Sequence, residues 1–557
     1  MTAKLIERLV LPTLLGLCVA VYLPVTQLGF VSDDPALILV NQPSIAQIPG
    51  FFFADLWAGT DTGYYRPLFV STLAVDRALF GHDAWGFHLH SLMWHLCAGL
   101  GVHRVARAWA GERAALVAAA IFLLHPLQSE VVAWVSARND SMAVALACAS
   151  AAVLLPAQRT WAHTMLGGGL ALGAMLSKEN AGAAVVALLP ALDIARRETP
   201  RRALDAARRY APLGVAVGIW LAMRAGFGPS SLPGGGAHQA LSTLANGPAI
   251  AAVYLQKLLI AYPLTDGHTV VYLPERLAED ATVLAVAAML AGFAVKRGGR
   301  PAAVAVGLMA WLVLPAIVGI GTRQLLGERY AYLPMVAVAL AAAATVSTWR
   351  SSLWVALLLP FWVWRIGDRV REWHDDVSLN AAAQRDLDTP YTQAWLADAF
   401  SRSGEPAAAL PWYERALRGE PPICTLATQT LSAALAAGQP TEGVRLGRLA
   451  YDRGCAAVTG FRETWALTML LDDQAPAAAK VMAPRPPCTA ANALVLATLS
   501  SLAGDEAGVS ECRTTVEDPA HFDEQVERLS ARQTRRSPPS LPAARPRRRT
   551  RHLPDAP

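Results

Sequence analysis

Residues 5–35, LIERLVLPTLLGLCVAVYLPVTQLGFVSDDP, contain the segment on which the rest of the chain depends. The apolar run from Leu5 to Leu23 is long enough to cross the hydrocarbon core of a bilayer as a helix. Asp33 and Asp34 follow it, where such a helix would leave the membrane. Charge is costly at that depth unless it has a use. The pair is therefore either part of a functional site or the start of a solvated loop that caps the next element.

The composition of the whole chain is that of a helical membrane protein. Of its 557 residues, 54% are hydrophobic and only 16% are charged. The apolar residues form long blocks of Ala, Leu and Val, and helices satisfy their own backbone across such blocks in lipid. The net charge of +5 comes largely from arginine clusters in the loops between the blocks. We interpret these clusters as topological signals and expect no nucleic-acid partner.

Further apolar segments predict an all-α, polytopic helix bundle of about eleven spans. The bundle occupies residues 1–370 and has a long first outer loop at 29–84. After the first span, the expected spans are 86–106, 113–125, 131–156, 160–176, 181–195, 211–226, 280–296, 301–320, 330–347 and 352–366.

The positive-inside rule orients this bundle. Lys4 and Arg8 place the N-terminus in the cytoplasm. The apolar stretch 243–262 is interpreted as a re-entrant or interfacial helix, because counting it as a span would put the basic loops at Lys296 and Arg350 outside. Everything that follows the last span is then extracytoplasmic, and the whole chain is expected in the inner membrane.

The composition becomes polar and helical after the last span, and residues 377–525 predict a soluble α-solenoid. The segment Tyr391 to Pro422 fits the 34-residue helix-turn-helix register of tetratricopeptide repeats. Gly438 and Ala450 continue a weaker copy, and three to four units are expected because stacked repeats need about three to bury a core. A generic alanine-rich array of helical hairpins is the alternative. The signature positions are Leu396, Ala397, Phe400, Gly404, Ala409, Tyr413, Ala416 and Pro421.

Four cysteines lie in this second region. Cys424 could approach Cys455, and Cys488 could approach Cys512, but whether disulfides form depends on the compartment. Residues 532–557 are rich in Arg, Pro and Ser and predict a disordered basic tail.

Polar residues gather at span ends on the same outer side as the aspartate pair. The stretches are His125 to Glu130, Arg138 to Asp140, Ser177 to Asn180 and Glu328 to Pro334. Each alone could be local charge neutralisation or a helix end. Ionisable groups that converge at membrane depth more often mark a pathway or an active site.

Such a site has the groups for sugar transfer from a lipid phosphate. Cations can hold the phosphate by charge-assisted hydrogen bonds, and a carboxylate can take the proton of an acceptor hydroxyl. Displacement at the anomeric carbon would then invert its configuration. Adjacent residues in extended chain point to opposite sides. One of Asp33 and Asp34 is therefore expected to face the substrate, while the other orients the loop or holds a metal; which does which is left open.

The chain resembles a known family in the order of these motifs and in the repeats appended to them. It is similar to the transmembrane and tetratricopeptide-repeat-containing O-mannosyltransferases, and more widely to the GT-C glycosyltransferases. The high Ala and Arg content suggests a bacterial homologue. The motifs are Phe30-Val31-Ser32-Asp33-Asp34, Tyr65-Arg66-Pro67-Leu68, His125-Pro126-Leu127-Gln128-Ser129-Glu130, Arg138-Asn139-Asp140, Leu176-Ser177-Lys178-Glu179 and Glu328-Arg329-Tyr330-Ala331-Tyr332-Leu333-Pro334.

The resemblance implies roles for individual residues. Asp33 and Asp34 become the catalytic pair. The expected donor-phosphate ligands are Arg66, Arg138, Lys178 and Arg329. The expected residues that line the site are His90, His125, Glu130, Asp140, Glu179, Glu328 and Tyr65.

The sequence therefore predicts an inverting membrane glycosyltransferase. It would move a hexose, mannose by resemblance, from a polyprenyl-phosphate carrier to a hydroxyl of a protein or another envelope acceptor on the periplasmic face. The repeats would bind a protein partner, and the spans would contact membrane lipid. A divalent metal is neither implied nor excluded, because an aspartate pair alone offers too few oxygen ligands. The alternatives are a non-catalytic membrane-anchored scaffold and a lipid-sugar transporter.

Overall fold

The computed structural model describes residues 3–57, 64–226, 237–262, 264–265, 268–269, 277–321, 325–346, 352–420 and 422–536. It divides into two compact units, Met1–Asp388 and Thr389–Pro557. The regular structure of the described residues is helical except for one short antiparallel pairing, between β1 (His268–Thr269) and β2 (Leu325–Leu326). The predicted all-α class is therefore confirmed.

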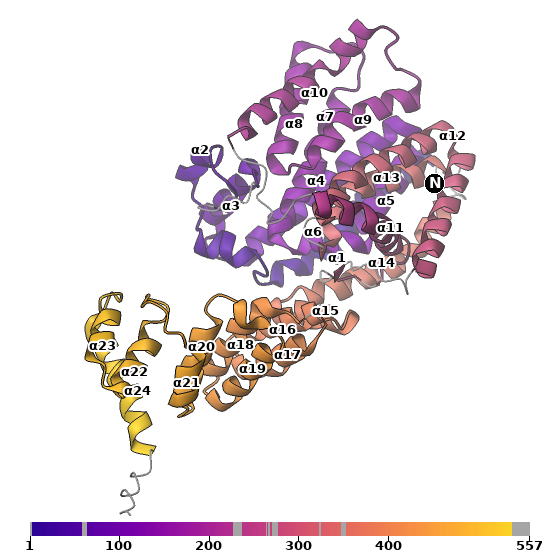
Figure 1. Cartoon of the computed structure of the whole chain (residues 1–557). Helices are drawn as coiled ribbons and strands as arrows, with labels where there is room; N and C mark the ends of the chain where they lie inside the picture. Colours follow the sequence, from indigo (N-terminus) through magenta and orange to yellow (C-terminus); the bar gives the residue numbers. More distant parts are fainter. Residues whose placement is uncertain are drawn as a thin grey trace, which may run out of the picture. The chain divides into compact units, whose positions relative to one another are not determined.

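The first unit is a bundle with a helix at each predicted apolar segment (Figure 1). The predicted span 131–156 is broken in two, and the segments 280–296 and 301–320 form one long element that bends at Gly299. The helices are α1 (Ala3–Tyr22), α2 (Ile48–Phe51), α3 (Pro67–Phe80), α4 (Ala84–Ala110), α5 (Glu112–Leu124), α6 (Ser129–Ala133), α7 (Arg138–Val153), α8 (Trp161–Ser177), α9 (Ala181–Arg196), α10 (Ala203–Arg224), α11 (Ala237–Ile260), α12 (Leu277–Gly321), α13 (Tyr332–Ala344), α14 (Leu353–Glu372) and α15 (Asp376–Asp386).

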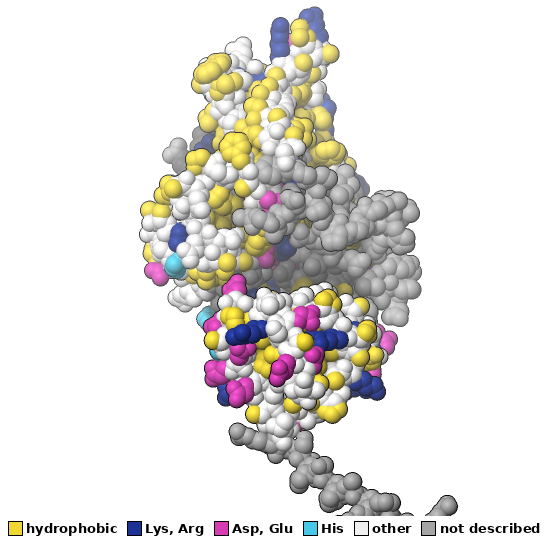
Figure 2. Space-filling view, turned by 60° about the vertical axis from the view of Figure 1, so that its left-hand side comes forward, with side chains coloured by type: hydrophobic (Ala, Val, Ile, Leu, Met, Phe, Trp, Pro, Cys, Tyr) yellow, Lys and Arg dark blue, Asp and Glu magenta, His cyan; other side chains and the backbone are white. Residues whose placement is uncertain are grey.

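Two described helical stretches are long and apolar enough to cross a membrane, Leu9–Gln27 and Ala278–Val313. A bent pair, Glu112–Leu124 with Pro126–Ala133, is a further candidate and turns by 53° at its break. Large apolar side chains are exposed on the bundle, among them Met289 and Leu357. Figure 2 shows hydrophobic side chains over much of the first unit, whereas charged side chains are interspersed on the second. These features support membrane association, and the count of about eleven spans stays a prediction.

Helix α4 packs tightly between α5 and α7, and glycines permit the close approach. A Cβ atom on Gly99 would lie 2.2 Å from the side chain of Leu123, and one on Gly101 would lie 2.8 Å from Cβ of Cys148. Helix α5 is buried on all sides over Ala114 to Leu124. Packing at this density holds the ends of α5 and α7, and with them the polar residues there, in fixed positions.

The second unit consists of short helices that follow one another in pairs. Gly404 and Gly438 lie at the turns of the first two pairs, 34 residues apart, with φ of +86° and +67°; glycine adopts such angles without strain. The paired helices agree with the predicted register, and their identity as tetratricopeptide repeats stays a prediction. The helices are α16 (Pro390–Arg402), α17 (Pro406–Arg418), α18 (Ala427–Ala436), α19 (Pro440–Asp452), α20 (Phe461–Leu471), α21 (Ala475–Val481), α22 (Ala493–Ala503), α23 (Glu506–Arg513) and α24 (Pro519–Arg536).

Both cysteine pairings that the sequence left open are present as disulfides. Cys424 is bonded to Cys455 and Cys488 to Cys512. Helix α24 extends to Arg536, so the first residues of the predicted tail 532–557 are helical. The remainder, 537–557, lies outside the described residues.

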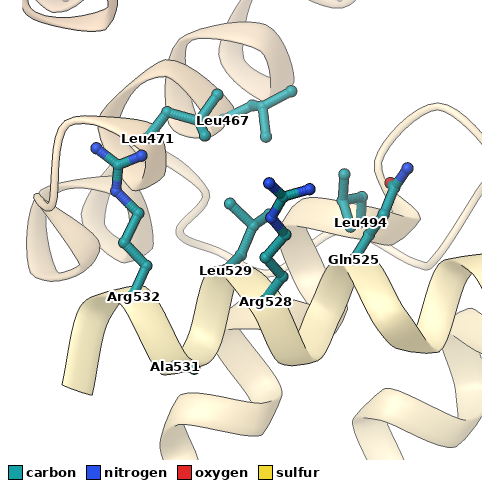
Figure 3. A pocket seen from close by; sticks show the side chains of 8 residues that line it. All are labelled: Leu467, Leu471, Leu494, Gln525, Arg528, Leu529, Ala531 and Arg532. Atoms are coloured by element: carbon teal, nitrogen blue, oxygen red, sulfur yellow. The ribbon is translucent and has the colours of Figure 1, made fainter. Parts of the chain in front are cut away.

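A cavity of about 830 Å³ opens between α20, α22 and α24 of the second unit. Figure 3 shows Arg528 and Arg532 projecting from α24 toward Leu467 and Leu471 on α20. The cavity therefore combines an apolar wall with guanidinium groups along one helix.

Candidate functional site

The two aspartates after the first span differ in burial, although Asp33 lies in a turn and Asp34 has helical backbone angles, whereas the prediction assumed an extended chain. Asp34 is fully buried, whereas Asp33 is exposed. Asp34 Oδ1 accepts hydrogen bonds from the backbone N–H of Ser136, at 2.8 Å, and from the Ser136 hydroxyl. Asp34 therefore anchors the loop, and Asp33 is the member of the pair that solvent or a substrate can reach.

Burial raises the pKa of Asp34 to about 7, although the hydrogen bonds from Ser136 oppose the shift. A carboxyl group in this position is close to half protonated at neutral pH. It can still accept the hydrogen bonds that anchor the loop when it is neutral.

The same loop is held on its other side by the segment that begins α15. The backbone N–H of Ser32 donates to Asp376 Oδ1 at 2.8 Å, and that of Gly29 donates to the carbonyl oxygen of His374 at 3.2 Å. Ser32 has a φ of +57°, in the left-handed region that residues with a side chain seldom adopt. The residue immediately before Asp33 is thus held in a conformation that the surroundings must stabilise.

A first polar cluster forms at the N-terminal ends of α3 and α7 and the C-terminal end of α8. Arg66 Nε lies 3.0 Å from Glu179 Oε2, and the backbone N–H of Tyr65 donates to Glu179 Oε1 at 3.0 Å. Lys178 forms a buried ion pair with Asp140. Burial lowers the pKa of Arg66, but the adjacent Glu179 carboxylate outweighs this effect and raises it. Five of the predicted residues thus come together here.

A second polar cluster forms around Arg329. Its Nη1 lies 2.5 Å from Glu130 Oε1, and the backbone N–H of Glu328 donates to Glu130 Oε2 at 2.7 Å. The guanidinium lies 4.8 Å from the ring centre of Trp134 and 5.1 Å from that of Tyr330. Gly327 leaves room for it, because a Cβ atom there would lie 2.4 Å from Arg329 Nη1.

The ring of Tyr330 joins the two clusters. Lys178 Nζ lies 5.8 Å from the centre of the ring, and the guanidinium of Arg329 contacts the ring as well. Segments that are far apart in the sequence are therefore contiguous in this part of the bundle. The cations Arg66 and Arg329 keep 14% and 21% of their side chains exposed, whereas Lys178 keeps 6%. The two arginines are therefore the more exposed of these cations.

Sequence reasoning missed two cations that surround Glu328. Lys257 Nζ lies 3.3 Å from Glu328 Oε1, and Arg369 Nη2 lies 3.0 Å from Glu328 Oε2. All three side chains are buried. Lys257 lies on α11, in the stretch 243–262 that the sequence predicts to be a re-entrant or interfacial helix. A lone charge inside an apolar stretch is itself a signal that could have identified it.

Three predicted residues have their polar atoms engaged by other protein groups. Arg138 is fully buried and donates to Asp76, Ser91, Thr72 and the carbonyl oxygen of Phe87, which ties α7 to α3 and α4. The ring nitrogens of His90 contact Asp76 and the indole N–H of Trp94, and those of His125 contact Leu127 and Leu258. Arg138 thus has the protein partners that a buried guanidinium requires, and its role as a phosphate ligand stays a prediction. Among the described residues, no group of three His, Cys, Asp or Glu side chains is arranged to hold a metal ion.

Comparison with known proteins agrees with the resemblance in the sequence. Residues 67–223 match the family model described as dolichyl-phosphate-mannose-protein mannosyltransferase. Arg138, Asp140, Lys178 and Glu179 fall within the matched residues, whereas Asp33, Asp34 and Arg329 fall outside them.

Several animal proteins are similar to parts of the chain. It is 37% identical over 134 residues to Protein O-mannosyl-transferase Tmtc2 of Drosophila melanogaster, covering 22% of this chain and 14% of the relative. It is 27% identical over 194 residues to Protein O-mannosyl-transferase TMTC2 of Mus musculus, covering 32% and 23%. The matches thus span less than a quarter of these relatives. No solved structure matches the chain. The predicted resemblance to the protein O-mannosyltransferases is thus confirmed over these parts of the chain.

Proposed function

We propose that the chain is an inverting glycosyltransferase of the membrane, which moves a hexose from a polyprenyl-phosphate carrier to a hydroxyl group of a protein. Mannose is the first sugar to test, because the related proteins are named O-mannosyl-transferases. The observation that carries the proposal is the exposed carboxylate of Asp33 on a loop that Asp34 anchors to Ser136.

Asp33 acts as the general base in this mechanism. Its carboxylate takes the proton of the acceptor hydroxyl while the hydroxyl oxygen attacks the anomeric carbon from the side opposite the phosphate. The bond between that carbon and the phosphate oxygen breaks, and its electron pair leaves with the polyprenyl phosphate. The new glycosidic bond has inverted configuration, and the proton remains on Asp33.

Arg66 and Arg329 are the proposed ligands of the departing phosphate, because they are the predicted cations with exposed side-chain surface. Each is paired with a carboxylate, Glu179 and Glu130 respectively. These carboxylates hold the guanidinium groups in place, and a guanidinium carries five N–H donors, enough to bind a carboxylate and a phosphate together. Lys178, paired with Asp140, contributes positive charge from the interior.

The proposal is tested with purified protein, a panel of polyprenyl-phosphate sugars and an acceptor peptide, by following release of the lipid phosphate. Asp33→Asn should lower turnover by about 10²–10⁴-fold, the usual contribution of a general base. Asp83→Asn is the matched control, since Asp83 is an exposed aspartate at the far end of the same outer loop. Undiminished transfer by Asp33→Asn would refute the mechanism, and no transfer by wild-type protein from any donor would refute the activity.

The proposed topology has about eleven spans, a cytoplasmic N-terminus and an extracytoplasmic second unit. The two disulfides of that unit support an oxidising compartment. An alkaline phosphatase fused after Arg418 should be active only if this region reaches the periplasm. An inactive fusion that is expressed at a normal level would reverse the proposed orientation.

The cavity of the second unit is the proposed binding site for the acceptor protein. It offers Leu467, Leu471 and Leu494 on its wall and Arg528 on α24, where Arg532 also lies, paired with Asp473. This combination is complementary to an extended segment with aliphatic side chains and carboxylates. A fluorescent peptide rich in leucine and glutamate should bind the full-length protein, and Arg528→Glu should weaken binding by about tenfold or more. Arg415→Glu, at an exposed arginine on α17, is the control; equal binding by both variants, or equal binding of a leucine-lysine peptide, would exclude this site.

A further inference from the structure

The aspartate loop is held from two sides, and the two sides contact each other. On one side Ser136 binds Asp34. On the other, Asp376 binds the backbone N–H of Ser32. Trp134, two residues before Ser136, stacks on Trp373, three residues before Asp376, with ring centres 6.1 Å apart and planes 25° from parallel. The loop is thus seated on a single support made from two distant segments.

The stacked pair Trp134 and Trp373 also contacts one of the proposed phosphate ligands. The guanidinium of Arg329 lies over the ring of Trp134, and that of Arg369 lies 5.8 Å from the ring centre of Trp373. Trp373 is fully buried. The Trp134–Trp373 stack therefore connects the segments that hold the Asp33 loop to Arg329.

The start of α15 is itself fixed. Asp375 caps the helix by accepting a hydrogen bond from the backbone N–H of Ser378 at 2.7 Å, and the side chain of Asn380 donates to the carbonyl oxygen of Asp376. Asp376 can therefore act as a rigid acceptor for Ser32. The left-handed Ser32 needs such an acceptor, because its backbone conformation is strained for a residue with a side chain.

We propose that Asp376 is a positioning residue for Asp33, which it holds at its working distance from Arg329 by fixing the left-handed Ser32. Asp376 does not touch the substrate and exchanges no proton with it. This inference rests on the proposed function, because it assigns the Asp33 loop a catalytic geometry to preserve. It adds a residue from beyond the last predicted span, which none of the sequence motifs includes.

The kinetic constants of Asp376 variants distinguish a positioning role from a purely structural one. Asp376→Ala removes the acceptor and should lower kcat by about ten- to a hundredfold, in line with the cost of a misplaced catalytic group, while KM for the lipid donor stays within about twofold. Asp376→Asn keeps an oxygen that can accept the Ser32 N–H, so it should restore most of kcat. Asp375→Asn keeps the helix cap and is the matched control for charge removed from the same turn.

A second pair of variants disturbs the same geometry from the other side. Ser32→Gly should retain activity because glycine adopts a positive φ freely, whereas Ser32→Val should reproduce the kcat loss of Asp376→Ala because a branched side chain disfavours that region. Thermal unfolding in detergent checks that each variant is folded.

The outcomes distinguish the inference from the proposed function. If wild-type protein transfers sugar and Asp33→Asn does not, yet Asp376→Ala keeps full kcat, Asp376 has no positioning role. An equal kcat loss in Asp376→Asn and Asp376→Ala would likewise overturn it, since the retained acceptor would then have no effect. If wild-type protein transfers no sugar from any donor, the proposed function fails first.

Discussion

Asp34 is a carboxyl group whose ionisation the fold opposes. Burial raises its pKa from 3.8 to about 7, so the folded protein holds a proton that the unfolded chain releases at lower pH. The stability that this proton contributes is complete below about pH 4 and is lost as the pH rises through about 7. The adjacent Asp33 is exposed. The two carboxylates of one dipeptide thus lie in different surroundings.

The first prediction concerns this proton. The asparagine of Asp34→Asn can still accept the hydrogen bonds of Ser136 but does not titrate. Between pH 5 and 7, wild-type protein should lose about 2 kcal/mol of stability relative to the variant. Thermal unfolding of both proteins in the same detergent across this range measures the difference. Parallel curves would show that Asp34 is ionised in the folded state throughout.

At the scale of elements, the sequence predicted the helices and most of the charged clusters. Apolar blocks marked the bundle helices, and polar motifs at their ends correctly indicated that Glu130, Lys178 and Arg329 would lie near one another. The lone charge of Lys257 in its apolar stretch was visible in the sequence, but the residues that Lys257 and Asp376 bind were not predictable. Each binds a residue far away in the chain, and one sequence contains no record of which distant segments meet.

The second prediction concerns α11 and α14, which enclose Glu328 between Lys257 and Arg369. Lys257→Met should destabilise the bundle by about 3 kcal/mol, because removal of one partner leaves a buried charge less compensated. Lys257→Met combined with Glu328→Leu should recover part of this loss, since Arg369 keeps Glu372 at 2.5 Å. Thermal unfolding of the single and double variants measures the coupling. Additive losses would show that the two side chains do not interact in the folded protein.

At the scale of the whole molecule, some properties follow from composition, and others depend on which distant segments contact each other. The division into an apolar bundle and a polar array of helix pairs follows from composition and periodicity, and the structure has its two units accordingly. Which cysteines pair was only suggested by their spacing, because it depends on how consecutive helix pairs stack. The number of spans also stays a prediction, since many bundle helices are short and carry polar residues at their ends.

The third prediction concerns the second unit as a whole. Its disulfides close loops of 31 and 24 residues in sequence separation. A loop of this size stabilises a fold by about 3 kcal/mol, largely through the unfolded state. Cys424→Ser combined with Cys455→Ser should therefore lower the unfolding midpoint of this unit, whereas Cys18→Ser, at a free buried cysteine of the bundle, should leave that unit unchanged. The thermal unfolding midpoint of the second unit is measured in oxidised wild-type protein and in both variants. An unchanged midpoint in the Cys424→Ser, Cys455→Ser variant would contradict the prediction.

The bond between Cys424 and Cys455 encloses the whole of α18 and α19. The exposed turn at Gly438 between these helices is the kind of site that proteases cut in folded proteins. After a cut there, the Cys424–Cys455 disulfide would still join the two fragments covalently. The cleaved protein would therefore migrate as a single band in a denaturing gel until a reductant separated the fragments. The bundle would then keep its appended helices even after the peptide chain between them had been broken.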